Sequence, residues 1–171
     1  MRFTFTLSVL SMFFLFLFSS VVVGQEQNDP LWIRAKNIHD RSFVFDAHAH
    51  KLSFDGDAKS SPASDNQQLT LEKMRKGGID GVGMFFAYYP LRDRSIISQV
   101  EQDMLALKQQ AAAHPSVAAV CQNSRELKET VSRGKTAILP GLEYFYGVFD
   151  GEVRRVDTLY HHGIRMITLM N

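Results

Sequence analysis

The chain has 171 residues, of which 45% are hydrophobic and 22% charged, with a formal net charge of +1. This length and composition are typical of one globular domain with its own core and exclude two large domains. Because the charge is balanced and no basic run stands out, nothing attracts phosphate, and no nucleic acid is expected as a partner. Cys121 is the single cysteine, so an internal disulfide is excluded and the fold must depend on packing.

The N-terminal segment has the pattern of a secretory signal peptide. Residues 3–23 are uncharged and rich in Phe, Leu and Val, Arg2 precedes them, and Val22 and Gly24 suit a cut ahead of Gln25. We therefore predict a signal peptide over residues 1–24 and an exported protein, located in a periplasm, outside the cell or on the outer face of a membrane. The alternative is an uncleaved signal that anchors the protein, because about 20 apolar residues can span a bilayer.

Strands and helices are predicted to alternate along the rest of the chain. The first helix begins at Pro30 with Asp29 as its N-cap, and apolar residues follow at helical spacing. Further helices are expected over residues 70–76, 94–114, 123–133 and 152–162, most of them ended by glycine or proline. Strands are expected over residues 43–50, 79–86, 137–143 and 164–170, with a minor strand over 117–120.

This alternation predicts an α/β fold with parallel strands joined by right-handed crossovers. Four main strands are half the number in an eight-stranded (β/α)8 TIM-type barrel. We therefore expect the N-terminal half of such a barrel over residues 25–171, with the chain truncated at its C-terminus.

The first strand carries a pair of histidines. Because side chains alternate faces along a strand, Val44, Asp46, His48 and His50 are predicted to share one face. Two imidazoles at the carboxyl end of a parallel strand are suited to binding a divalent metal ion. The alternative is a strand end that carries two solvated histidines by chance. Residues 51–68 are rich in Ser, Asp and Gly and are expected to form a long loop that leaves directly from this pair.

Four segments, in order, together resemble the renal or membrane dipeptidases, metallopeptidase family M19. They are FDAHAH at residues 45–50, MRKGGIDGVGMFFAYYP at 74–90, LPGLE at 139–143 and VDTLYHHGIRMITL at 156–169. The resemblance covers the chain from about residue 30 to its end. It implies the N-terminal half of a (β/α)8 barrel of the metal-dependent hydrolases.

The resemblance also implies a metal site. His48 corresponds to the family's first metal histidine and Glu143 to the glutamate that bridges two zinc ions, while Asp46 would orient a ligand imidazole. His50 stands where the family usually has an aspartate, and as an imidazole it can still ligate zinc. The family's remaining metal ligands lie beyond Asn171. Four other histidines are interpreted as structural residues at helix ends: His39, His114, His161 and His162.

Three functions remain open from the sequence. The first is a zinc dipeptidase that hydrolyses small dipeptides through a binuclear site. The second is another amidohydrolase-type metal hydrolase that acts on a lactone, a cyclic amide or an N-acyl group, which His50 favours. The third is a noncatalytic secreted fragment, which would cover its open strand edges by pairing with a second copy or with another half-barrel. Membrane association would come from an uncleaved signal or from a C-terminal anchor beyond Asn171.

Overall fold

The computed structural model describes residues 29–54, 69–88, 96–143, 149 and 151–168. The chain divides into two units, Met1–Ser42 and Phe43–Asn171, and each is described by itself. The predicted signal peptide lies outside the described residues. In the part of the chain that is described, no helix combines the length and the apolar character needed to cross a membrane.

The first unit contributes helix α2, Pro30–Arg41. It begins as predicted: the side chain of Asp29 accepts a hydrogen bond from the backbone N–H of Leu31 at 2.8 Å, and Pro30 occupies the first turn. Proline fits there because its missing N–H would have no partner in the helix.

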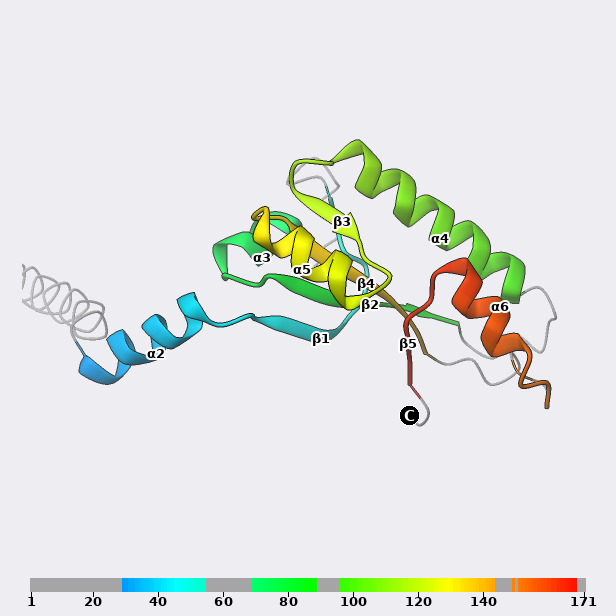
Figure 1. Cartoon of the computed structure of the whole chain (residues 1–171), viewed down its shortest axis with the longest axis horizontal. Helices are drawn as coiled ribbons and strands as arrows, with labels where there is room; N and C mark the ends of the chain where they lie inside the picture. Colours follow the sequence, from blue (N-terminus) through cyan, green and yellow to red (C-terminus); the bar gives the residue numbers. More distant parts are fainter. Residues whose placement is uncertain (1–28, 55–68, 89–95, 144–148, 150, 169–171) are drawn as a thin grey trace, which may run out of the picture. The chain divides into compact units, whose positions relative to one another are not determined.

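The second unit is built on a parallel sheet (Figure 1). Its strands are β1 (Phe45–Ala49), β2 (Gly81–Ala87), β3 (Ala118–Val120), β4 (Thr136–Glu143) and β5 (Met166–Ile167). They lie in the order β1-β2-β4-β3, and β5 also pairs with β4. All of β2 runs beside β4, while β3 and β5 take successive parts of the other edge of β4, at its beginning and near its end. β4 is therefore the central strand of this half-barrel.

Helices join these strands in the predicted order. They are α3 (Leu71–Lys76), α4 (Ile96–Ala113), α5 (Ser124–Ser132) and α6 (Arg155–His162). Thr70 and Asn123 cap α3 and α5 through their side chains. α6 begins three residues later than expected, since residues 151–154 form turns and Arg154 gives no side-chain cap.

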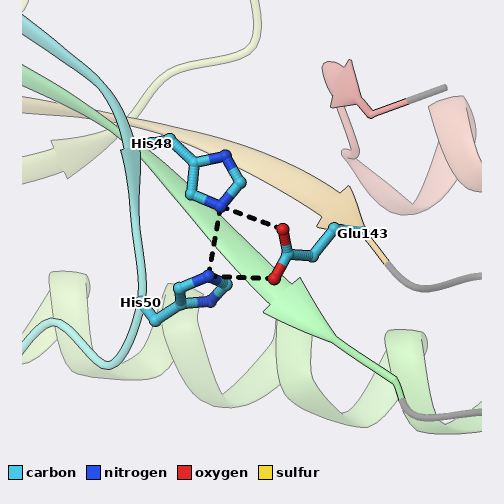
Figure 2. Close-up of side chains that lie close together, drawn as sticks. All are labelled: His48, His50 and Glu143. Carbon is cyan, nitrogen blue, oxygen red and sulfur yellow. Dashed lines mark hydrogen bonds and ion pairs between the residues drawn. The ribbon is translucent and has the colours of Figure 1, made fainter. Parts of the chain in front are cut away.

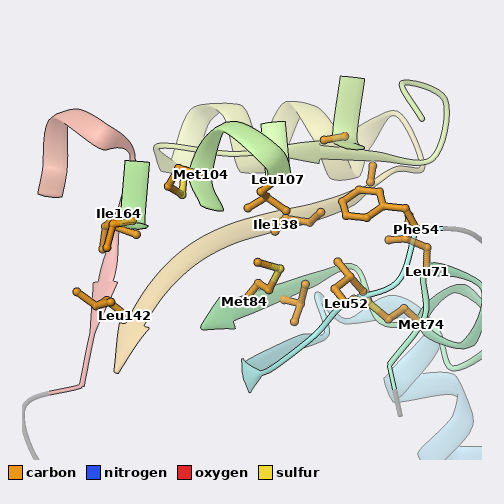
Figure 3. Close-up of a cluster of buried hydrophobic side chains, with 14 of the residues drawn as sticks. Leu52, Phe54, Leu71, Met74, Met84, Met104, Leu107, Ile138, Leu142 and Ile164 are labelled. Carbon is orange, nitrogen blue, oxygen red and sulfur yellow. The ribbon is translucent and has the colours of Figure 1, made fainter. Parts of the chain in front are cut away.

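The hydrophobic core lies between the sheet and the helices (Figure 3). Alternate residues of β2 and β4 point into it, and α4 covers them with one apolar face. The core side chains of these three elements are Val82, Met84, Ile138, Leu142, Ile96, Val100, Met104, Leu107 and Ala111, all 7% exposed or less. Burying each of the larger side chains is worth roughly 1.5–3 kcal/mol. The remaining residues of β2 and β4, among them Gly83, Phe85, Gly141 and Glu143, form the other face of the sheet, where the candidate site lies.

Candidate metal centre

Three predicted ligands meet at the carboxyl ends of β1 and β4 (Figure 2). His48 Nε2 lies 3.0 Å from Glu143 Oε2, and His50 Nε2 lies 2.9 Å from Glu143 Oε1. The two Nε2 atoms are 3.1 Å apart. Glu143 is nearly buried, with a side chain 6% exposed, whereas the imidazoles are 41% and 40% exposed. Each carboxylate oxygen thus faces a different histidine, at the edge of solvent.

A bulge in β1 turns the histidines toward this group. Asp46 pairs with Val82 and Ala49 pairs with Met84, so the two lie on the core face although they are three positions apart in the chain. An odd spacing on one face requires an irregular step, and the register shifts between Asp46 and Ala49. The prediction that Asp46 shares a face with His48 and His50 is therefore wrong, because the bulge reverses the alternation.

Gly83 of β2 makes room for the bulge. A Cβ atom built on Gly83 would lie 2.6 Å from the carbonyl oxygen of Ala47, closer than such atoms approach one another. The absence of a side chain lets the bulged backbone lie directly against β2, as expected for a glycine inside a strand.

Asp46 supports the main chain of the bulge. Its carboxylate Oδ1 accepts a hydrogen bond from the backbone N–H of His48 at 3.1 Å. This contact with a residue two positions ahead is typical of an aspartate that fixes a local turn. The structure places Asp46 against the backbone that carries His48, whereas the sequence predicted contact with a ligand imidazole.

Phe85, which the sequence analysis did not single out, contacts both histidines. Its ring stacks on the imidazole of His48, with centroids 4.1 Å apart and planes 3° apart. Its carbonyl oxygen lies 3.0 Å from His50 Nδ1. Because a carbonyl only accepts hydrogen bonds, Nδ1 of His50 is the donor in this contact, and the other ring nitrogen, Nε2, is directed to Glu143.

This arrangement suits a metal ion. Two ligands on a tetrahedral zinc ion, each about 2.0–2.1 Å from it, are separated by about 3.3 Å. The three ligand atoms approach this spacing, and imidazole nitrogen with carboxylate oxygen is a usual zinc donor set.

A cleft of about 720 Å³ opens beside the group, and His50 and Glu143 form part of its wall. Tyr88 and Asp103 line it further out, and the Tyr88 hydroxyl donates a hydrogen bond to Asp103 Oδ2 at 2.5 Å. Burial, followed by the hydrogen bond to Asp103, raises the pKa of Tyr88 well above its usual range. The backbone N–H of Tyr88 also donates to the carbonyl oxygen of Glu143 at 3.3 Å, which ties the ends of β2 and β4 together.

The other histidines of the described residues lie at or near helix ends. His114 and His161 each bring Nδ1 to a carbonyl oxygen four residues earlier, at 2.9 and 2.6 Å. His39 and His162 lie near the C-terminal ends of α2 and α6. Where the chain is described, His48, His50 and Glu143 form the one group able to hold a metal ion.

The solved structures with a similar fold include two from Pseudomonas aeruginosa. One is described as the probable dipeptidase PvdM from Pseudomonas aeruginosa: TM-score 0.62 at 18% identity, over 81% of this chain and 37% of that one. The other is described as an amidohydrolase from Pseudomonas aeruginosa: TM-score 0.54 at 16% identity, over 77% of this chain and 35% of that one. The chain thus spans little more than a third of either protein.

The search of curated protein sequences finds no match. The sequence profile described as membrane dipeptidase (peptidase family M19) matches residues 33–171, which is most of the chain. The resemblance noted from the four sequence segments is confirmed, as is the parallel half-barrel. The chain belongs to the membrane dipeptidase family, peptidase family M19.

Proposed function

We propose that the protein carrying this chain is a zinc-dependent dipeptidase, which hydrolyses the peptide bond of small dipeptides. The observation that carries this proposal is the convergence of His48, His50 and Glu143 in a chain of the membrane dipeptidase family. Because the chain spans little more than a third of the similar solved structures, the activity and the substrate are proposed for the whole protein.

The three side chains would hold one zinc ion through the two Nε2 atoms and a carboxylate oxygen. In the binuclear site that the family resemblance implies, Glu143 would be the carboxylate that two zinc ions share. Zinc in such a site supplies a Lewis acid for the peptide carbonyl and lowers the pKa of a water molecule used in hydrolysis.

Glu143 is the residue that most needs a cation. Its carboxylate is nearly buried, and a buried carboxylate is costly unless it is paired. Its two oxygens lie 3.0 Å from His48 Nε2 and 2.9 Å from His50 Nε2, so a cation bound by the carboxylate would also lie within reach of both imidazoles. The exposed sides of the imidazoles leave room for a substrate to approach from the cleft.

His50 favours a second candidate, an amidohydrolase-type enzyme that acts on a lactone, a cyclic amide or an N-acyl group. An imidazole in place of a carboxylate gives the site one negative charge less and leaves the metal more electrophilic. Rates on dipeptides and lactones, measured side by side on the same preparation, distinguish the two. Faster lactone turnover would favour the second candidate.

The test uses the natural full-length protein that contains this chain. Its metal content is measured, and dipeptide hydrolysis is followed before chelation, after chelation and after zinc is returned. We expect activity that is lost on chelation and restored by zinc, and that falls at least a hundredfold in His48→Ala. His161→Ala is the matched control, because His161 lies at the end of α6, and it should keep full activity. Zinc binding without hydrolysis of any dipeptide would contradict the proposal.

Export is part of the same proposal, because residues 1–24 have the pattern of a signal peptide. The mass of the mature natural protein tests it. An N-terminus at Gln25 is expected, and a protein that retains Met1 would favour the uncleaved anchor.

A further inference from the structure

We propose that Phe85 is the positioning residue of this metal centre: its ring sets the plane of the His48 imidazole, and its carbonyl sets the orientation of His50. The inference rests on the proposed metal site, since it concerns how the ligands are held before the ion binds. Phe85 does not contribute a ligand atom and acts through the two histidines.

The ring of Phe85 provides a fixed surface for an otherwise exposed ligand. Phe85 is 5% exposed, while the side chain of His48 is 41% exposed. The near-parallel stack, with centroids 4.1 Å apart, covers one face of the imidazole. A histidine at the protein surface samples several ring orientations, and this stack selects the one in which Nε2 points to Glu143.

The ring of Phe85 packs against the backbone of Gly141. Phe85 and Gly141 are paired across β2 and β4. A Cβ atom built on Gly141 would lie 2.7 Å from two ring carbons of Phe85 and 2.8 Å from a third. Only glycine lets the ring lie flat against β4, so the ring is held between the β4 backbone and the imidazole of His48.

The carbonyl of Phe85 orients the second ligand. By accepting from Nδ1 of His50 at 3.0 Å, it leaves Nε2 free to bind a metal ion. A hydrogen bond of this kind behind a ligand histidine fixes its tautomer and its ring orientation. Glu143, the third ligand, follows Gly141 by two residues on the same strand. The Phe85–Gly141 pair therefore helps to position all three ligands: the ring contacts His48, the carbonyl contacts His50, and Gly141 lies two residues before Glu143.

The experiment compares Phe85→Leu with Phe86→Leu in the natural full-length protein. Phe86 is the matched control, because it is the next residue and packs partly buried against the hydrophobic core on the other side of the sheet. Zinc affinity is measured by competition with a chelator. Phe85→Leu removes the ring behind His48 and keeps the main-chain carbonyl behind His50, so we expect it to weaken binding by roughly tenfold, the lower end of the range found when groups that orient ligand histidines are removed. Phe86→Leu should change it less than threefold.

A second readout tests the stack without any substitution. In the metal-free wild-type protein, the carbon-bound ring protons of His48 should resonate upfield of random-coil values, because they lie over the Phe85 ring. Random-coil positions for these protons would overturn the assignment of Phe85, whatever the variants do.

The outcomes separate this inference from the proposed function. A wild-type protein that binds zinc and hydrolyses dipeptides, but whose zinc affinity is equal in Phe85→Leu and Phe86→Leu, would overturn the role of Phe85 alone. A wild-type protein that binds no zinc would overturn both. Lower zinc affinity specific to Phe85→Leu, with shifted His48 protons in the wild type, would support the inference even if the substrate proves not to be a dipeptide.

Discussion

The imidazole of His50 is held from behind by the backbone of Phe85, with Nδ1 3.0 Å from its carbonyl oxygen. The two residues are 35 positions apart in the chain and lie on β1's C-terminal end and on β2. Pairing of parallel strands thus brings a main-chain acceptor to a side chain that the first strand alone could not orient. The same contact decides which nitrogen of His50 can bind a metal ion.

Glu143→Gln should separate metal binding from folding. The amide has the size of the carboxylate and can either donate to or accept from an imidazole Nε2, so the metal-free variant should fold as the wild type does. Its zinc affinity should fall by about a hundredfold, since the anionic ligand is lost. Thermal unfolding with and without zinc measures both effects. The wild type should gain about 2.7 kcal/mol at a hundredfold excess of zinc over its Kd.

Glu152→Gln is the control for this substitution, because Glu152 is 68% exposed and lies outside the metal centre. It should leave the stabilisation by zinc unchanged. Equal stabilisation by zinc in wild type and Glu143→Gln would show that Glu143 is not a ligand.

Tyr88 should make stability fall in alkaline solution. Burial and the hydrogen bond to Asp103 raise its pKa above the ordinary value near 10, so the folded protein holds the phenol proton more tightly than the unfolded chain does. This contribution is complete below about pH 10 and is lost as the pH rises further. Tyr88→Phe should lower the free energy of unfolding by about 1 kcal/mol at pH 8. Above pH 10, the free energy of unfolding of this variant should fall less steeply with pH than that of the wild type.

Urea unfolding at a series of pH values measures this effect. Tyr160→Phe serves as the comparison, because Tyr160 is 57% exposed. If both variants keep the alkaline loss of the wild type, another group is responsible for it.

Glu126 should contribute stability that disappears in acid. Its carboxylate accepts hydrogen bonds from the backbone N–H of Gln122 at 2.8 Å and from the Asn123 side chain at 2.7 Å, and chiefly the first lowers its pKa. Because the pKa of Glu126 is lower in the folded protein than its unfolded value near 4.5, the ionised carboxylate stabilises the fold when the pH is above 4.5. This stabilisation is lost as the pH falls through the pKa of the folded protein. Glu126→Gln should therefore be less stable than wild type at pH 7 and equal to it near pH 2.

The difference at pH 7 should stay below about 1 kcal/mol, because the group is largely solvated and screened. Glu129→Gln, an exposed position on the same helix, should show no such dependence on pH. A difference between Glu126→Gln and wild type that persists at pH 2 would assign the effect to the shape of the side chain and not to its charge.

Signals that act over a few residues predicted most of the secondary structure. The cap of α2 was expected at Asp29, and its side chain accepts a hydrogen bond from the first turn of that helix. The minor strand over 117–120 is present as β3. These features are determined by residues adjacent in the sequence, so they can be predicted from the sequence alone.

The directions in which the side chains of β1 point depend on the contact between β1 and β2, which the sequence of β1 alone does not determine. The alternation of side chains along a strand correctly predicted that His48 and His50 lie together, because both residues follow the bulge. It placed Asp46 with them wrongly, because the bulge needs the space that Gly83 leaves on β2. Glu143 was assigned through family resemblance, since a carboxylate at a strand end has no local pattern that marks it as a ligand. Phe85 had no signal at all until the register of β2 against β4 was known.

Gly163 should be far less tolerant of a side chain than Gly134, although both end a helix with positive φ. Gly134 has φ of +69° and open space where a Cβ would be, so Gly134→Ala should cost about 1 kcal/mol from backbone strain alone. At Gly163, with φ of +110°, a Cβ would lie 2.8 Å from Met104 Cε. Methionine is flexible, but Met104 is 1% exposed within the core, so it can move only by displacing its neighbours. Gly163→Ala should therefore cost about 3 kcal/mol, with overpacking added to strain. Urea unfolding of the two variants gives the comparison, and equal costs would mean that Met104 yields freely and that the packing of α4 against α6 is looser than this contact implies.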